Sequence, residues 1–138
     1  MTPKYFIDTC IWLNLIKKET KGKVLFWKHA QDFFKQHNDS ELIISKIVIN
    51  ELFNHTESEQ INSVLKLNNI ILIDVTKEDY TFAKTIEFNS NYSISPNDCI
   101  HIAICLRINV ALITRDYLLI QESKKYNILA IEPEKLLY

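Results

Sequence analysis

Short apolar runs alternate along the chain with longer segments in which apolar residues recur at helical spacing. The runs predict five strands, at residues 4–8, 41–45, 70–75, 110–114 and 128–131. The segments between them predict helices at residues 9–18, 23–36, 46–55, 57–67, 77–88 and 116–126, and a further helix that begins at Pro96. Because the strands are short and continuously apolar, they are typical of a parallel sheet that is covered by helices on both faces.

Helix ends that usually carry glycine must be built here from other residues. Gly22 is the only glycine in the chain. Asparagine is the next choice for the left-handed conformation that ends many helices. Asn69, Asn109 and Asn127 each stand just before a predicted strand. We therefore expect these three asparagines to end the preceding helices.

The composition indicates one domain that spans residues 1–138. Of the 138 residues 47% are apolar, which is enough for one substantial core. No apolar stretch is long enough to span a bilayer, and the first residues lack the pattern of a signal peptide. The three cysteines are odd in number and lack CxxC spacing, which favours buried, reduced thiols. These features predict a cytoplasmic protein without membrane contact.

Acidic residues stand where a parallel sheet would gather them at one edge. Asp8 ends the first predicted strand, and Asp116 lies two residues beyond the fourth. Ligands of open α/β sheets bind at the carboxyl ends of strands, so both positions favour a site. Both residues could also cap the helices that follow them. Asp98 has the same alternative, because Ser95 and Pro96 before it form the beginning of a capping pattern.

Glu51 has no capping role to explain it. It lies on the apolar stripe of the helix predicted at residues 46–55, with Ile47 and Val48 one turn before it. A buried charge needs a partner. That partner is either Arg107 or a lysine in an ordinary salt bridge, or a site shared with the other acids.

Convergence of the four acids would have a clear physical consequence. Two unit charges ~4 Å apart repel by about 4 kcal/mol at an effective dielectric constant near 20. Such a cluster needs a divalent cation, or carboxylates with raised pKa values. Ligands that are all oxygen suit Mg²⁺ or Mn²⁺ and do not suit zinc.

Four segments in this order resemble the PIN domain family, and within it the VapC-type toxin nucleases. The segments are FIDTCIWL, VINELF, SPNDCIHIAIC and LITRD, and the resemblance covers essentially the whole chain. It implies a Rossmann-like three-layer α/β/α sandwich on a five-stranded, mainly parallel sheet. It also implies an acidic site, oriented by the hydroxyl of one threonine. Carried over residue by residue, the site comprises Asp8, Glu51, Asp98, Asp116 and Thr114.

The resemblance implies a Mg²⁺-dependent endoribonuclease, with Mn²⁺ as an alternative ion, that leaves a 3′-hydroxyl and a 5′-phosphate. Asp8 and Asp98 would be the main metal ligands, and Asp116 would act directly or through water. Glu51 would orient or deprotonate the attacking water. Toxins of this type usually form homodimers and are silenced by a cognate antitoxin protein.

The RNA substrate also needs positive charge near the acids. Arg115, between Thr114 and Asp116, is the residue we expect at the scissile phosphate. The segment 17–28 adds five lysines, and whether they bind RNA or only face solvent stays open. Its aromatic residues, with the two phenylalanines that follow, are expected in the core or in a dimer contact. The lysines are Lys17, Lys18, Lys21, Lys23 and Lys28, and the aromatics are Phe26, Trp27, Phe33 and Phe34.

Other functions fit the sequence less well. A phosphoacceptor receiver domain needs paired acids after the first strand, where this chain has Asp8 followed by Thr9. A haloacid-dehalogenase-type phosphatase needs D-x-D at the same place. A non-catalytic PIN-like module that binds RNA, and an RNA-processing nuclease outside a toxin system, stay open. His101, one turn after Asp98, is either a hydrogen-bonded core histidine or a residue that supports the acidic site from behind. We favour the first, because no histidine pair here has a metal-ligand spacing.

Overall fold

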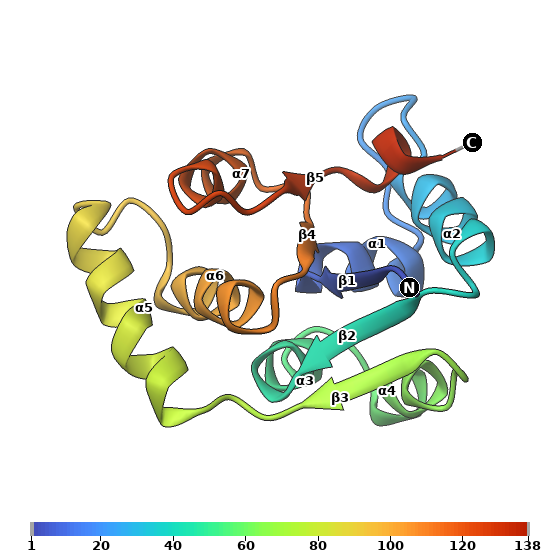
Figure 1. The fold of residues 1–138 in the computed structure, drawn as a ribbon. Helices are drawn as coiled ribbons and strands as arrows, with labels where there is room; N and C mark the ends of the chain where they lie inside the picture. The colour runs from blue at the N-terminus through green and yellow to red at the C-terminus, as the bar shows by residue number, and fades with distance from the viewer. Residues whose placement is uncertain (1, 138) are drawn as a thin grey trace.

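A single parallel sheet forms the centre of the computed structural model, which describes residues 2–137 (Figure 1). The strand order is β3-β2-β1-β4-β5, and every neighbouring pair is parallel. The prediction of a five-stranded, mainly parallel sheet is therefore confirmed. The strands are β1 (Lys4–Ile7), β2 (Glu41–Ser45), β3 (Ile70–Ile73), β4 (Ala111–Ile113) and β5 (Ala130–Ile131).

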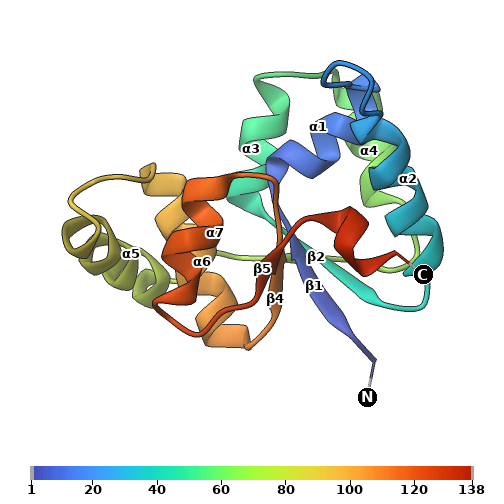
Figure 2. The ribbon, with the colours of Figure 1, turned by 90° about the horizontal axis from the view of Figure 1, so that it is seen from above.

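Helices cover both faces of this sheet. Figures 1 and 2 show α1 to α4 on one face and α5 to α7 on the other, which gives the expected α/β/α sandwich. A short 3-10 helix after β5, at Pro133–Leu136, was not predicted. The helices are α1 (Thr9–Lys17), α2 (Phe26–Gln36), α3 (Lys46–Phe53), α4 (Ser58–Leu65), α5 (Lys77–Asn89), α6 (Pro96–Ile108) and α7 (Tyr117–Lys124). None of the helices within residues 2–137 is both long and apolar enough to cross a membrane.

The strand order reverses direction between β1 and β4. From β1 the chain moves outward through β2 to β3, and then returns to place β4 on the other side of β1. Such a reversal leaves a crevice at the carboxyl ends of the two strands, where open α/β sheets bind their ligands. The register pairs Ile7 with Ile113, so the residues that follow the two strands also lie side by side.

Helix α6 is the most deeply buried helix, which explains its continuous apolar sequence. All seven residues from Cys99 to Cys105 are buried, because α5 packs against the side of α6 that faces away from the sheet. The outer strand β3 is covered less well than we expected from its apolar sequence. Ile71 and Leu72 are 36% and 48% exposed, because β3 is an edge strand.

Two local predictions are corrected by backbone detail. Helix α2 begins at Phe26 and not at residue 23, because Lys21 and Val24 exchange two backbone hydrogen bonds around Gly22, whose φ is +62°. Asn109 and Asn127 adopt positive φ values of 54° and 58°, as expected. Asn69 does not.

The side chain of Asn69 explains its place in the sequence. Its amide donates to the carbonyl oxygens of His37 and Ser40, at 3.3 and 2.9 Å. Asn69 therefore ties the entry of β3 to the loop before β2 and does not end a helix.

An ion pair joins α5 to α6. Asp79 of α5 is 2% exposed, and Arg107 of α6 donates to its carboxylate at 2.9 Å. Burial raises the pKa of Asp79, but the hydrogen bonds from Arg107 and from the N–H of Thr76 outweigh this effect and hold the pKa below its usual value. Arg107 therefore neutralises the buried carboxylate and allows α5 to pack closely on α6.

Replacing Arg107 by Gln should lower the free energy of unfolding by about 2–3 kcal/mol, because the buried Asp79 carboxylate loses its cation. The loss stays below that of a fully buried pair, since the Arg107 side chain is 36% exposed. Urea denaturation measures the change. The control is Lys46→Gln, which removes an exposed pair with Asp74 and should leave the midpoint unchanged. Equal effects of the two substitutions would contradict this assignment.

Candidate metal centre

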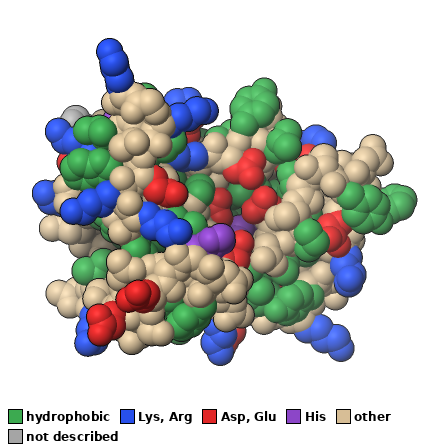
Figure 3. Space-filling view, turned by 180° about the vertical axis from the view of Figure 1, so that it is seen from behind, with side chains coloured by type: hydrophobic (Ala, Val, Ile, Leu, Met, Phe, Trp, Pro, Cys, Tyr) green, Lys and Arg blue, Asp and Glu red, His purple; other side chains and the backbone are tan. Residues whose placement is uncertain are grey.

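The four predicted acids come together at the carboxyl edge of the sheet, beside the crevice between β1 and β4. Asp8 follows β1 and caps α1, and Asp116 follows β4 and caps α7. Asp98 lies in the first turn of α6, and Glu51 lies in α3. Figure 3 shows acidic side chains gathered near the middle of this face. The capping alternative is thus correct for Asp8 and Asp116, and it is compatible with a shared site.

Asp8 is fixed by the strand register and by one buried hydroxyl. The side chain of Thr114, which is fully buried, donates to Asp8 Oδ2 at 2.7 Å. The same hydroxyl accepts the N–H of Asp116 at 3.1 Å. The other carboxylate oxygen of Asp8 accepts the N–H of Thr9 at 2.8 Å. Thr114 therefore links two of the acids, which is the orienting place that we expected for it.

Glu51 reaches the same edge from the opposite side of the crevice. Ser45, the last residue of β2, accepts the N–H of Val48 and so begins α3 directly after the strand. Glu51 Oε1 accepts the hydroxyl of Thr9 at 2.8 Å, next to Asp8. The salt bridge to Arg107 that we considered for Glu51 is not formed, because Arg107 pairs with Asp79.

The surroundings of Glu51 favour its charged form. Burial raises the pKa of Glu51, but contacts with His101, Thr9 and Asn97 outweigh it and hold the pKa below its usual value. The side chain remains 30% exposed. Glu51 is thus an ionised carboxylate with access to solvent.

His101 lies among the acids, which was the less favoured of the two places that the sequence allowed. Its side chain is fully buried, and Nε2 lies 3.5 Å from Asp8 Oδ1 and 3.5 Å from Glu51 Oε1. These distances are too long for normal hydrogen bonds. Among the described residues neither ring nitrogen has a hydrogen-bond partner. His101 is buried, as we expected. It has no hydrogen-bond partner among the described residues and faces a charged cluster, so the expectation of a hydrogen bond within the core is wrong.

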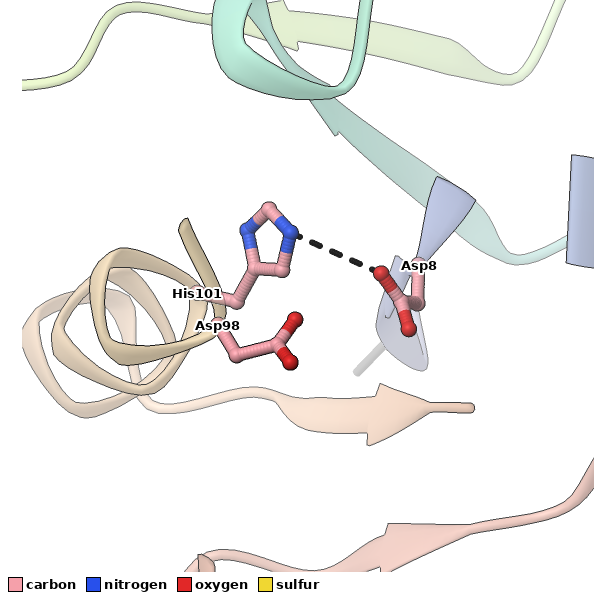
Figure 4. Close-up of side chains that lie close together, drawn as sticks. All are labelled: Asp8, Asp98 and His101. Carbon is pink, nitrogen blue, oxygen red and sulfur yellow. Dashed lines mark ion pairs between the residues drawn. The ribbon is translucent and has the colours of Figure 1, made fainter. Parts of the chain in front are cut away.

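A sequence signal for His101 did exist. It follows Asp98 by three residues in a helix, so the two side chains share one face of α6. In Figure 4 both side chains extend from α6 toward Asp8. Ligand atoms of Asp8, Asp98 and His101 all lie within 4.8 Å of one another.

The carboxyl group of Asp98 is the member of the cluster whose ionisation is most disfavoured. Its helix begins regularly, because Ser95 Oγ accepts the Asp98 N–H at 3.2 Å. Burial, and then the negative charges of Asp8 and Asp116, raise the pKa of Asp98 to about 6. His101 opposes this shift. Burial lowers the pKa of His101, but its contact with Glu51 and the charges of Asp8 and Asp98 outweigh this effect and raise the pKa above its usual value.

These residues fit a divalent cation. Two carboxylates at close range and a buried imidazole without a hydrogen-bond partner are what a cation would neutralise and satisfy. Asp8, Asp98 and His101 are near enough to share one ion. Asp116 is exposed and lies outside this close group. Of the two predicted ways for Asp116 to contact the ion, directly or through a water molecule, this position favours the second.

Arg115 points away from the acids. Nε donates to Asn14 at 2.7 Å, and Nη1 donates to both carboxylate oxygens of Glu134 at 2.8 and 2.7 Å. The guanidinium also lies 4.0 Å above the ring centroid of Phe26. In this structure Arg115 joins the loop before α7 to α1, α2 and the C-terminal segment. Its predicted contact with the scissile phosphate stays a prediction that would require these partners to be released.

The lysine-rich segment is open to solvent. Its five lysines are all exposed, and none of them forms an ion pair within residues 2–137. Figure 3 shows basic side chains on both sides of the acidic centre. Of the aromatic residues, Phe33 is fully buried, and Phe34 stacks on Trp12 with ring centroids 4.8 Å apart. These two confirm the expected core role, whereas Trp27 is only half-buried.

The variant Asp98→Asn should be more stable than the wild type when no metal is present. An acid whose pKa is higher in the folded state costs stability once it is ionised, so the cost is complete above pH 6 and disappears as the pH falls toward 4. We expect a gain of about 2 kcal/mol at pH 7.5 in EDTA, which shrinks between pH 6 and pH 4. Urea denaturation at several pH values measures it. Asp39→Asn, an exposed acid at the other edge of the sheet, should show no such dependence. A loss of stability at pH 7.5 in Asp98→Asn would contradict repulsion in the cluster.

Comparisons with known proteins agree with this geometry. The model of the PIN domain family matches residues 5–122. A search of curated protein sequences gave no match. Among solved structures, the fold is similar to VapBC2 from Rickettsia felis bound to a promoter DNA fragment, with a TM-score of 0.67, 20% identity, and coverage of 92% of this chain and 96% of that chain. It is also similar to DNA-bound VapBC from Salmonella typhimurium, with a TM-score of 0.64, 17% identity, and coverage of 95% of this chain and 98% of that chain. A third similar structure is PAE2754 from Pyrobaculum aerophilum, with a TM-score of 0.65, 16% identity, and coverage of 97% of this chain and 86% of that chain. With the family model matching most of its length, the chain belongs to the PIN domain family.

Proposed function

We propose that this protein is a divalent-metal-dependent endoribonuclease and the toxin of a toxin–antitoxin pair. One observation carries the proposal: four acids from β1, α3, α6 and α7 meet beside the β1–β4 crevice around a buried hydroxyl and a buried imidazole. Such an acidic centre suits phosphodiester hydrolysis assisted by metal ions. The family match, the similar folds of VapBC structures and the similar fold of a structure named as a toxin–antitoxin complex support the proposal.

Three aspartates would hold the cation, which we propose to be Mg²⁺ or Mn²⁺. Asp8 and Asp98 would bind it directly, and Asp116 directly or through water. When bound, the cation lowers the pKa of a coordinated water and stabilises negative charge on the phosphoryl group. Thr114 would keep Asp8 in place through the hydrogen bond that it donates. The cluster is accessible from one face of the molecule, which is the face on which a phosphodiester would approach.

Glu51 is the residue that we propose to handle the proton of the attacking water. Its pKa is held below its usual value, so it is ionised. As an ionised carboxylate it can accept a hydrogen bond from the water and so orient it, or accept the proton itself as a weak base. Thr9 holds one of its oxygens at 2.8 Å, which fixes the direction of the side chain. The partial exposure of Glu51 leaves room for water beside it.

The proposed partners follow from the same comparisons. One solved structure of similar fold, from Klebsiella pneumoniae, is named as a toxin–antitoxin complex, which supports a cognate antitoxin for this chain. We also propose a homodimer, and a cytoplasmic location where RNA is accessible. An RNA-processing nuclease without an antitoxin would use the same site. A non-catalytic module is the weaker alternative, because the four acids are together at one edge.

Asp8→Asn, Glu51→Gln and Asp98→Asn should each reduce RNA cleavage at least about a hundredfold, because each removes a charge that acts on the cation or on the water. Cleavage of a fluorescent single-stranded RNA with Mg²⁺ or Mn²⁺, and with EDTA, measures this. Circular dichroism checks that the variants are folded. The control is Glu59→Gln, an exposed acid of α4 outside the cluster. Full activity in all three variants would reject this site.

Replacing Lys17, Lys21 and Lys23 by Gln should weaken RNA binding without changing the metal site. If the three lysines contact phosphates of a single strand, the slope of log K against log salt concentration should fall by about 2. Fluorescence anisotropy in the Glu51→Gln background measures binding without cleavage. The matched control replaces three exposed lysines elsewhere, namely Lys66 directly after α4, Lys84 of α5 and Lys124 of α7. Equal slopes in the two triple variants would show that the lysine-rich segment only faces solvent.

A further inference from the structure

We propose that His101 is itself a metal ligand, so that the centre combines carboxylates with one imidazole and binds Mn²⁺ in preference to Mg²⁺. This inference rests on the metal dependence of the proposed function and not on the identity of its substrate. A site that used only the carboxylates would have oxygen ligands alone and would lack this preference for Mn²⁺.

The burial of His101 is the first observation. The imidazole is fully buried, and its ring packs against Phe6 with centroids 5.1 Å apart. Two polar nitrogens in such a place normally have hydrogen-bond partners, because an unpaired buried polar group is costly. Within residues 2–137 neither nitrogen of His101 has one. A bound cation would satisfy Nε2, the nitrogen that faces the acids.

The geometry around Nε2 is the second observation. Nε2 lies between two carboxylates, 3.5 Å from an oxygen of Asp8 and 3.5 Å from an oxygen of Glu51. A third carboxylate, on Asp98, completes a group whose ligand atoms lie within 4.8 Å. Adjacent ligands of an octahedral ion at ~2.1 Å are about 3 Å apart, and opposite ones about 4 Å. Small side-chain rotations therefore suffice for one ion to contact Asp8, Asp98 and His101 together.

The helix sets the direction of these two ligands. Asp98 and His101 are three residues apart in α6, so both side chains leave the same face of a buried helix. Figure 4 shows the carboxylate of Asp98 and the ring of His101 on the same side of α6, with Asp8 opposite them. The three residues thus surround one point from two elements of the fold.

Ligand chemistry gives the metal preference. Carboxylates and water suit Mg²⁺ and Mn²⁺ alike. A nitrogen ligand favours the first-row transition ions, a series in which Mn²⁺ is the weakest binder, whereas Mg²⁺ keeps oxygen ligands. Replacing one oxygen ligand by a histidine nitrogen therefore raises the affinity for Mn²⁺ relative to Mg²⁺. The test compares His101→Gln with His55→Gln, an exposed histidine one turn beyond Glu51.

Nitrogen coordination is measured by electron spin echo envelope modulation of Mn²⁺ bound to the protein. We expect nitrogen modulation in the wild type and in His55→Gln, with its replacement by the ¹⁵N pattern when histidine is labelled with ¹⁵N. We expect its loss in His101→Gln. The labelled wild type decides the question even if His101→Gln does not fold. Bound Mn²⁺ without nitrogen modulation would overturn the proposal.

Isothermal titration calorimetry with Mn²⁺ and Mg²⁺ measures the preference in the same proteins. The preference for Mn²⁺, taken as the ratio of the Mg²⁺ to the Mn²⁺ dissociation constant, should fall at least about tenfold in His101→Gln and stay unchanged in His55→Gln. An unchanged ratio in His101→Gln would overturn the preference. Neither measurement uses RNA, so a protein that coordinates Mn²⁺ through nitrogen but cleaves no RNA would refute the nuclease function alone. A protein that binds neither ion would refute both.

Discussion

Repulsion between carboxylates at the β1–β4 crevice is the constraint around which this structure is organised. Asp8 is 6% exposed, and burial, followed by the charges of Asp8 and Asp116, raises the pKa of Asp98. Ligand atoms of Asp8 and Asp98 lie within 4.8 Å of each other, and two unit charges ~4 Å apart repel by about 4 kcal/mol at an effective dielectric constant near 20. The helix ends at this edge offset only part of that cost, because a charge at a helix N-terminus gains about 0.3–1 kcal/mol. The repulsion that remains would be relieved by a bound cation, so it favours cation binding at this edge.

The scaffold holds the acids in place through groups that are neutral and buried. Thr114 and Thr9 each donate a hydroxyl to a carboxylate, and neither brings a charge of its own. A hydroxyl donor fixes the orientation of an oxygen and leaves most of the negative charge available. Arginine and lysine at the same positions would neutralise the site and remove its affinity for metal. The two arginines of the chain are instead committed to Asp79 and Glu134, outside the cluster.

Sequence reasoning succeeded where local order determines the three-dimensional position. Asp8 and Thr114 follow neighbouring parallel strands, so the register alone places them side by side. Glu51 could be recognised because a charge on an apolar helix stripe requires a partner. Asn69 was misjudged, and the partners of Arg115 were not foreseen, for one reason, which is that both side chains reach residues distant in sequence. Asn69 donates to Ser40, and Arg115 donates to Asn14. Hydrogen bonds between residues so far apart in the chain leave no pattern in the local sequence.

His101 shows most clearly how a correct local interpretation can miss a role. Its burial in α6 followed from the apolar sequence around it, but the same burial brings it among carboxylates that come from β1 and α3. Whether a buried histidine is part of a core or part of a site depends on what the tertiary fold places opposite it. Here the reversal of strand order at β1 places Asp8 opposite α6, since β4 returns beside β1 only after α6 has crossed the sheet. The position of His101 in the acidic cluster is therefore a consequence of topology, and the sheet order had to be known before its chemistry could be inferred.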